Sequence, residues 1–415
     1  MSLHLEVWLE DCTLGPAIKI GELDCDRGRG SEVIRFSYSP AWLATARAIA
    51  IDPELPLVQG PQYPGGRRAL HGIFRDTAPD RWGRVLMERR EAIEAQRENR
   101  RARRLRDWDF LTGVNDQTRM GALRLWDPEV KSYVDVRELG APPATRLREL
   151  EAIVELLEAE GSEDRPEYVQ WLRQLIAPGT SLGGSRPKAS FTAEDGTLWL
   201  AKFPASDDRR DVGAWEFLAY QLALRAGVVM PEAKLLRFAR RHRTFVVKRF
   251  DRVHDSRRLY ASAMTLLQRN DGDEGSYVDI AEAIQNVGAP VTIAADLTQL
   301  YRRIVFSIFI GNRDDHLRNH GFLWGGDGWS LSPAFDINPN PDKGEHALAI
   351  DDVDSSPSID HLRVTADYYR LSRADADAIE NEVRAAVDGW RQVAASLDLP
   401  AREIKQLEAV LESSR

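Results

Sequence analysis

The stretch FIGNRDDHLRNHGFLW (residues 309–324), followed by WSLSPAFDINP (329–339), decides the fold of this chain. Asp314 and Asn319 stand five residues apart, directly after an apolar segment with helical spacing. GFLW and WSL flank a Gly-Gly-Asp-Gly turn, a pattern that predicts a β-hairpin. The hairpin would return Asp336 to the corner that holds the other two residues, so the sequence predicts three polar side chains in one place.

These residue types suit phosphoryl transfer. That reaction needs a carboxylate near the attacking hydroxyl and oxygen ligands that hold magnesium on the phosphates. Protein kinases place a base Asp, a magnesium-binding Asn and a later magnesium-binding Asp in this order. We therefore expect Asp314 to act as the base and Asn319 and Asp336 to bind Mg²⁺. The capping of turns is the other common use of Asp and Asn.

Two histidines in the same stretch allow a different interpretation. His316 and His320 stand four residues apart, so a helix could present both to a metal ion, with Asp314 and Asp336 completing the site. We expect instead that His316 braces the loop and that His320 caps the end of a strand. No HExxH motif supports metallohydrolase chemistry.

A Gly-rich loop and a strand precede this region, in TSLGGSRPKASF (180–191) and LWLAKFPA (198–205). Glycine lets backbone amides approach phosphates closely, although a surface turn is an equal alternative. Lys202 shares a strand face with two leucines, and a lysine there is costly unless it is paired. Glu216 in the next helix is the natural partner. Lys188 could instead face the phosphates, and a snorkelling surface lysine is the remaining alternative.

The order of elements predicts an α+β protein with a two-lobed, protein-kinase-like fold. Residues 1–140 form a strand-rich N-terminal module, with a helix from about Ala78 to Arg104. Residues 141–258 hold the Gly-rich loop, the lysine strand, a helix and a strand pair. Residues 259–415 form a mainly helical lobe, irregular only between about Gly311 and Pro339.

Composition limits the classes of function. The 415 residues carry a net charge of −9 and only two cysteines, which excludes a zinc site built from cysteines and argues against a disulfide framework. We expect a cytoplasmic protein without a signal peptide or membrane span.

Between Arg81 and Arg106 the sequence has ten arginines and four glutamates, a local net charge of +6. A solvated helix with Glu/Arg pairs explains this best, and contact with a partner or DNA phosphates is the alternative.

Five motifs together resemble the HipA-type toxin kinases of bacterial toxin–antitoxin systems: SLGGSRPKASF, LAKFPA, VVKRFDR, GNRDDHLRN and PAFDINP. The opening, with FSYSPAWL and TAPDRWGRVLMERR, looks like the N-terminal module of that family, so the resemblance covers nearly the whole chain.

The resemblance implies an ATP- and Mg²⁺-dependent serine/threonine protein kinase with Asp314 as the base. It implies that Lys202 contacts the ATP phosphates and that the segment 247–250 lies by the adenine as the inter-lobe hinge. Ser181 matches the position of self-phosphorylation in the family, and Ser185 and Thr180 are further candidates. The full set of ATP-binding candidates is Lys202, Ser181, Gly183, Gly184, Lys188, Glu216, Val247, Lys248, Phe250 and His316.

The resemblance also implies partners. Family members phosphorylate proteins, notably aminoacyl-tRNA synthetases, and so arrest growth and promote persistence. A HipB-like helix-turn-helix antitoxin holds them and binds DNA, so this chain would contact DNA only indirectly and no membrane. A small-molecule kinase on a related fold, or a non-catalytic binding module that works through the basic helix, remains an alternative function.

Overall fold

The computed structural model describes residues 2–28, 31–66, 68–136, 140–176, 186–351 and 354–412. The chain folds into two compact units, each built from two segments. The first unit contains residues 1–207 and 251–261, and the second contains 208–250 and 262–415. The predicted division at residues 140 and 258 stays a prediction. Five predicted residues lie outside the described part of the chain: Thr180, Ser181, Gly183, Gly184 and Ser185.

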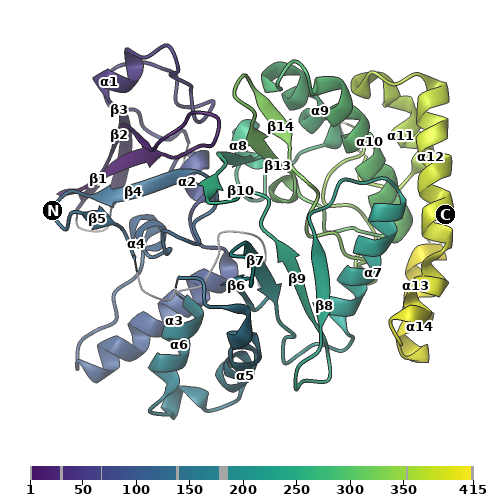
Figure 1. Ribbon diagram of the computed structural model, residues 1–415, viewed down its shortest axis with the longest axis horizontal. Helices are drawn as coiled ribbons and strands as arrows, with labels where there is room; N and C mark the ends of the chain where they lie inside the picture. The colour runs from purple at the N-terminus through teal and green to yellow at the C-terminus, as the bar shows by residue number, and fades with distance from the viewer. Residues whose placement is uncertain are drawn as a thin grey trace. The chain divides into compact units, whose positions relative to one another are not determined.

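An antiparallel five-stranded sheet opens the first unit (Figure 1), as the alternating pattern of the first forty residues predicts. Alternation buries Leu5, Val7 and Leu9 on one face of the first strand. The strand order is β3-β2-β1-β4-β5. The bounds are β1 Ser2–Leu9, β2 Ile18–Arg27, β3 Glu32–Tyr38, β4 Leu123–Asp127 and β5 Ser132–Tyr133.

Helix α3 is shorter than the predicted span from Ala78 to Arg104. It begins at Arg81 because the Asp80 side chain caps it, accepting a hydrogen bond of 2.8 Å from Gly83 N. It ends at Arg97. The helices of this unit are α1 Pro40–Leu43, α2 Gly72–Asp76, α3 Arg81–Arg97, α4 Asp107–Thr112, α5 Leu147–Glu158 and α6 Tyr168–Ile176, with 3-10 turns η1 Ala144–Arg146 and η2 Ser162–Asp164.

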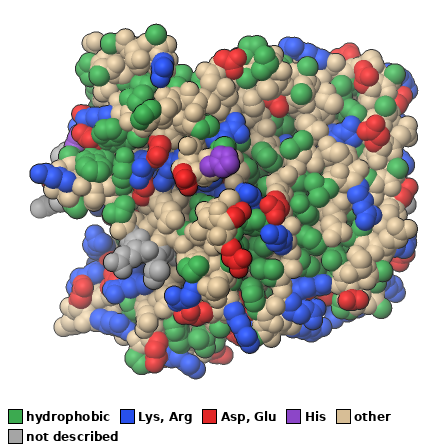
Figure 2. All heavy atoms as spheres, in the orientation of Figure 1, with side chains coloured by type: hydrophobic (Ala, Val, Ile, Leu, Met, Phe, Trp, Pro, Cys, Tyr) green, Lys and Arg blue, Asp and Glu red, His purple; other side chains and the backbone are tan. Residues whose placement is uncertain are grey.

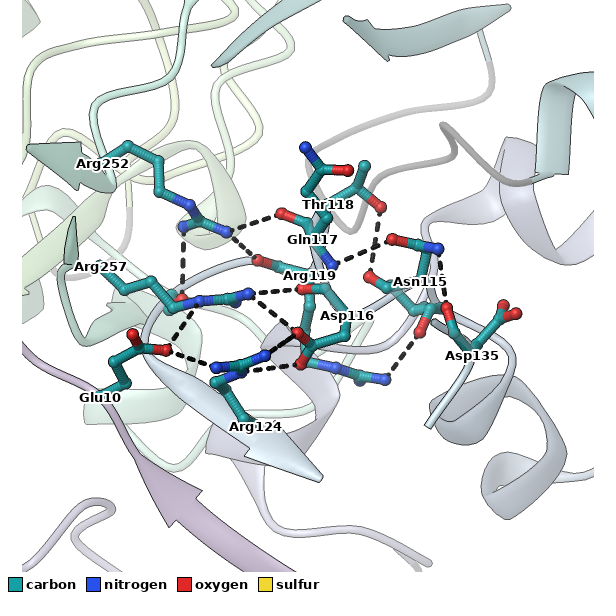
Figure 3. Close-up of polar contacts among 12 residues, drawn as sticks. Glu10, Asn115, Asp116, Gln117, Thr118, Arg119, Arg124, Asp135, Arg252 and Arg257 are labelled. Carbon is teal, nitrogen blue, oxygen red and sulfur yellow. Dashed lines mark hydrogen bonds and ion pairs between the residues drawn. The ribbon is translucent and has the colours of Figure 1, made fainter. Parts of the chain in front are cut away.

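Two further hairpins complete the first unit. One pairs β6 Lys188–Thr192 with β7 Leu198–Lys202, and the other pairs β10 Arg252–Val253 with β11 Ser256–Arg257. The second hairpin belongs to the returning segment 251–261, and buried ion pairs fasten it (Figure 3). Arg257 Nη2 lies 3.2 Å from Asp116 Oδ2, and Arg252 Nη2 donates to Arg119 O at 2.8 Å. This network fixes the segment that follows the predicted hinge.

The second unit is mainly helical, as predicted for most of its length. Helix α10 is its centre and is buried along most of its length, and α12 packs against it (Figure 1). The helices are α7 Val212–Arg225, α8 Ala263–Leu266, α9 Tyr277–Val287, α10 Ile293–Ile310, α11 Ile359–Val364, α12 Arg373–Asp388, α13 Trp390–Ser396 and α14 Ala401–Glu412, with 3-10 turns η3 Leu317–Asn319 and η4 Ala366–Tyr369. Its strands form the pair β8 Ala233–Leu236 and β9 Thr244–Lys248 and the hairpin β13 Gly321–Trp324 and β14 Trp329–Leu331. The chain passes into this unit at strand β12, Tyr260–Ser262.

The prediction of helix directly after Pro339 is wrong. The described residues between Asn340 and Ser358 have no regular structure, and helix resumes only at Ile359. Pro341 and Gly344 stand in this segment and disfavour helix. None of the described helices combines the length and apolar character that crossing a bilayer requires.

Candidate functional site

Helix α10 delivers the loop that carries Asp314 and Asn319. Gly311 caps its C-terminus with a φ of 66°, in the left-handed region where a side chain would add strain. The chain then runs irregularly through Asp314 to the turn η3 and into β13. The Asp314 side chain is 60% exposed, so its carboxylate is open to a group arriving from solvent.

Asn319 closes this loop on itself and keeps one oxygen unused. Its backbone N–H donates to His316 O at 2.8 Å, and its Nδ2 donates to Asp314 O at 3.2 Å. Within the described part of the chain, its buried Oδ1 has no hydrogen-bond partner. Leaving a buried carbonyl unpaired is costly, so a bound ligand is the natural partner for this atom.

Asp336 reaches the same corner after the β13–β14 hairpin. Its φ is 58°, a left-handed conformation that is uncommon outside glycine and that collects at functional sites. Two backbone N–H groups hold the following residues to the α10 end: Asn338 N donates to the Asn312 side-chain Oδ1 at 3.4 Å, and Asn340 N donates to Gly311 O at 2.8 Å.

The three predicted residues line one cavity of about 140 Å³. This volume is well below the roughly 300–1,000 Å³ of a site for a whole small molecule. It suits an ion and a phosphate-sized group. The full lining is Arg210, Val212, Trp215, Asn312, Asp314, Asn319, Asp336, Asn338, Pro339 and Asn340.

A buried carboxylate anchors the loop from behind. Asp315 Oδ2 accepts a hydrogen bond of 2.9 Å from Tyr277 Oη, and Asp315 Oδ1 lies 3.0 Å from His320 Nε2. Burial alone would raise the pKa of Asp315, but the charge and hydrogen bond of His320, with the Tyr277 hydroxyl, hold it below its usual value. Asp314 and Asp315 are neighbours with opposite surroundings, so Asp315 fixes the loop while Asp314 faces outward.

The two histidines do not share a metal site. His320 pairs with Asp315, and the His316 side chain is half-buried in the loop. No group of three or more His, Cys, Asp or Glu side chains in the described ranges is arranged to hold a metal ion. The donor set around Asn319 and Asp336, which includes asparagine oxygens, is the hard-oxygen kind that Mg²⁺ prefers.

Lys343 is a residue of this site that sequence reasoning missed. Its Nζ forms an ion pair with Asp314 Oδ1. Lys343 lies in the irregular segment after Pro339 that was predicted to be helical, and no motif marks it. Asn338 was also missed. It lines the cavity, and its buried Oδ1 has no hydrogen-bond partner among the described residues. Its spacing of two residues from Asp336 is the signal that could have found it.

The predicted hinge is placed next to Asp336. Val247 and Lys248 end strand β9, and both are half-buried. The Phe250 ring packs against the Phe335 ring with centroids 5.4 Å apart. Because Phe335 directly precedes Asp336, the second unit itself brings the hinge segment close to one end of the candidate site.

The lysine candidates lie in the first unit. Lys188 and Lys202 stand directly opposite each other on β6 and β7, so their side chains share a face. Lys188 Nζ forms a buried ion pair of 2.8 Å with Asp80 Oδ2. Burial raises the pKa of Asp80 despite the charge of Lys188. Lys202 and Glu216 are both buried but belong to different units, and their pairing stays a prediction.

At least three of the ten arginines between Arg81 and Arg106 form ion pairs with nearby carboxylates. Arg100 Nη1 lies 2.5 Å from Glu91 Oε1, and this contact holds the pKa of Glu91 down at about 2. Arg103 joins the same carboxylate, and Arg84 pairs with Asp107. Positive and negative side chains are interspersed over the visible face (Figure 2). These pairs favour the solvated-helix interpretation.

Comparison with known proteins covers most of the chain. Residues 180–390 match the family described as HipA-like C-terminal domain, and residues 5–125 match the HipA N-terminal domain. Two curated proteins of Sinorhizobium fredii are similar. "Putative kinase Y4mE" is 24% identical, and the match covers 73% of this chain and 71% of that protein. "Putative kinase Y4dM" is 29% identical, and the match covers 34% of this chain and 37% of that protein.

A solved structure shares the fold. It is the complex of HipA, HipB and operator DNA from the toxin–antitoxin system of Shewanella oneidensis MR-1. The match has a TM-score of 0.64 at 17% identity and covers 99% of this chain and 95% of that one.

Proposed function

Because this chain belongs to the HipA family and is a kinase of that family, we propose that it is a Mg²⁺- and ATP-dependent serine/threonine protein kinase that acts as a growth-arresting toxin. The observation that carries this proposal is that Asp314, Asn319 and Asp336 line the same small cavity. A phosphate-sized space with one exposed carboxylate and a buried unpaired amide oxygen fits the end of a nucleotide.

Asp314 is the proposed catalytic base. The oxygen of a substrate hydroxyl forms a bond to the γ-phosphorus of ATP while the bond from that phosphorus to the β–γ bridging oxygen breaks. ADP leaves with the electron pair, and the hydroxyl proton passes to the Asp314 carboxylate. Asp314 is exposed as this role needs, because the hydroxyl of a protein substrate must reach its carboxylate.

Asn319 and Asp336 are the proposed Mg²⁺ ligands. The unpaired Oδ1 of Asn319 and the carboxylate of Asp336 line the same cavity, and such oxygens fit the preference of Mg²⁺. When bound, Mg²⁺ neutralises charge that develops on the phosphates. The loop contacts of Asn319 and the anchor of Asp315 hold Asn319, and the contacts of Asn338 and Asn340 hold the segment that follows Asp336.

The rest of the nucleotide site is proposed from the family. Lys202, supported by Glu216, contacts the ATP phosphates, and the Gly-rich loop with Ser181, Gly183 and Gly184 covers them. The remaining ATP-binding candidates are Lys188, Val247, Lys248, Phe250 and His316. Lys188 has the least support, because Asp80 already pairs with it.

Regulation and partners are also proposed from the family. Self-phosphorylation at Ser181, or at Ser185 or Thr180, would place a dianion in a loop built for phosphate and so oppose ATP binding. In the cytoplasm, a HipB-like antitoxin would bind and neutralise this chain and would itself contact DNA. This agrees with the Shewanella complex, which contains HipA, HipB and operator DNA together. The proposed protein substrate is an aminoacyl-tRNA synthetase, the target that the family resemblance implies.

The acceptor class is tested in a dialysed cell extract with γ-labelled ATP and Mg²⁺. Wild type is compared with Asp314→Asn, and Asp327→Asn in the exposed hairpin turn is the matched control. We expect label on phosphoserine or phosphothreonine of a few proteins, with wild type and the control alike and none with Asp314→Asn. Label that appears only on metabolites in undialysed extract would instead establish a small-molecule kinase.

A further inference from the structure

Lys343 contacts the proposed base but has no role in the account above. Its ammonium pairs with Asp314 Oδ1. The ion pair uses Oδ1, which leaves Oδ2 for a substrate hydroxyl in the proposed reaction. The Lys343 and Asp314 side chains are 47% and 60% exposed. An exposed pair of this kind contributes little to stability, so holding the fold together does not explain it.

The position of Lys343 is set by its backbone and its neighbours. Arg313 Nη1 donates to Lys343 O at 2.5 Å. Arg210, which lines the cavity, lies 3.3 Å from Asp342 Oδ2. Asn340 N donates to Gly311 O at 2.8 Å. The segment is therefore fastened at Lys343 itself and on its N-terminal side by contacts that do not use the ammonium, so the ammonium can change partner while these contacts persist.

The chemistry of transfer gives such a cation a use. Negative charge gathers on the γ-phosphoryl group and the leaving oxygen, and a preorganised cation that meets this charge stabilises the transition state. Asp314 must lie within hydrogen-bond reach of the attacking hydroxyl, so the group beside Asp314 is also beside the phosphoryl group. A four-carbon stem lets the lysine ammonium reach from the carboxylate to that group.

We propose that Lys343 is a catalytic residue whose ammonium holds Asp314 in the free enzyme and contacts the γ-phosphoryl group during transfer. The proposal rests on the proposed kinase function. The bonds are those of the transfer itself: the acceptor oxygen binds the γ-phosphorus, ADP departs with the electron pair, and the proton goes to Asp314 Oδ2. Lys343 keeps its proton throughout and supplies only charge.

Single-turnover transfer from saturating Mg²⁺-ATP tests the proposal, together with the binding affinities for Mg²⁺-ATP and Mg²⁺-ADP. The variants are Lys343→Ala, Lys343→Met and Lys343→Arg. Lys234→Ala is the matched control. Lys234 is an exposed lysine whose Nζ lies 3.3 Å from Glu232 Oε1, and it does not line the cavity. Thermal unfolding checks that each variant folds.

We expect Lys343→Ala and Lys343→Met to slow transfer by roughly 100-fold, the scale of one lost charge-stabilising donor. Lys343→Arg recovers part of the rate, and the control is unchanged. Lys343→Ala also loses most of the preference for ATP over ADP, since the contact is to the γ-phosphate. Transfer by Lys343→Ala at or above the wild-type rate would overturn the proposal, because the pair would then be idle or inhibitory.

The two proposals can fail separately. If wild type transfers no phosphate but Lys343→Ala still loses the preference for ATP, the kinase function fails while the γ-phosphate contact stands. If neither the rate nor the ATP preference depends on residue 343, the contact itself is refuted.

Discussion

Tyr277 Oη and Asp315 Oδ2 are joined by a buried hydrogen bond of 2.9 Å, which ties helix α9 to the loop that carries the proposed base. Asp315 is 5% exposed, and Tyr277 is fully buried. A carboxylate in such a place needs all its partners, because burying an unpaired charge is costly. The rigidity of the loop at Asp314 therefore depends on a residue 38 positions earlier in the chain.

Removing that hydroxyl tests the anchor. Tyr277→Phe keeps the ring but leaves Asp315 with one partner fewer, so we expect a loss of about 1.5–3 kcal/mol in the free energy of unfolding. Transfer slows as well, because the loop loses its fixed position. Urea unfolding and the transfer rate are the two measurements. Tyr368→Phe, at an exposed tyrosine of the same unit, is the control. An unchanged free energy of unfolding in Tyr277→Phe would show that the hydrogen bond does not contribute to stability.

Magnesium dependence tests the ligands. Asp336→Asn keeps a residue that tolerates the left-handed backbone but removes the charge. We expect it to weaken the Mg²⁺-dependent part of ATP binding by roughly tenfold or more, a scale seen even for residues that support metal ligands indirectly. Calorimetric titration of ATP with Mg²⁺ and with a chelator measures the effect. Asn319→Ala behaves similarly, and Asp327→Asn does not. If Mg²⁺ increases the ATP affinity of wild type and of all three variants equally, Asn319 and Asp336 are not metal ligands.

Variants of the buried Lys188–Asp80 ion pair test whether Lys188 has a structural role or binds ATP. Asp80→Asn keeps the cap of α3 but removes the carboxylate charge that pairs with the buried Lys188 ammonium, so we expect a loss of about 3–5 kcal/mol in the free energy of unfolding. Adding Lys188→Met restores much of that loss. If the double variant also binds Mg²⁺-ATP as tightly as wild type, Lys188 is structural. A large loss of ATP affinity in the folded double variant would return Lys188 to the nucleotide site.

Stability toward acid depends on His346 in the second unit. Burial lowers its pKa to about 4, although Asp315 opposes this and Arg313 adds to it. The unfolded chain has an ordinary histidine pKa near 6.5, so it takes up a proton that the folded state refuses. Stability contributed by the neutral ring is complete above about pH 6.5 and falls as the pH drops toward 4, by up to about 3 kcal/mol.

His346→Gln should flatten this dependence. Urea unfolding at pH 7 and pH 4.5 measures the difference between wild type and variant. In the first unit, His71 with a pKa of about 4 acts in the same direction, and Asp52 with a pKa raised to about 6 by burial opposes it. The comparison of wild type with the variant cancels both. A variant that loses as much stability in acid as wild type would show that His346 is not the titrating group.

The sequence predicts the local parts of the site well, because they depend on short spacing. The five-residue spacing of Asp314 and Asn319 and the turn before Trp329 are enough to place the loop and hairpin. The end of α3 shows the limit. Helical spacing continues to Arg104, but Asn99 adopts a φ of 51° and Arg100 turns back to Glu91. Asn99 in the left-handed conformation ends the helix before the periodic pattern does, and the Arg100–Glu91 pair holds the chain where it turns back.

Long-range partners could not be predicted from local spacing. Tyr277 and Asp315, or Lys343 and Asp314, meet only once the chain is folded. Lys343 was also hidden by the wrong expectation of helix after Pro339. Asp80 as the partner of Lys188 lies 108 residues away from it, which no spacing rule reaches. Sequence reasoning therefore identifies the groups that react more readily than the groups that hold them.

The most direct test of the central claim is the intact mass of purified, phosphatase-treated protein after incubation with Mg²⁺-ATP, beside Asp314→Asn. The account predicts that wild type gains the mass of one or more phosphoryl groups on the peptide that contains Ser181, Ser185 and Thr180. It predicts no gain for Asp314→Asn, although that variant still binds Mg²⁺-ATP. Equal phosphorylation of both proteins, or none of wild type in the presence of bound Mg²⁺-ATP, would contradict the assignment of this site as a self-phosphorylating protein kinase.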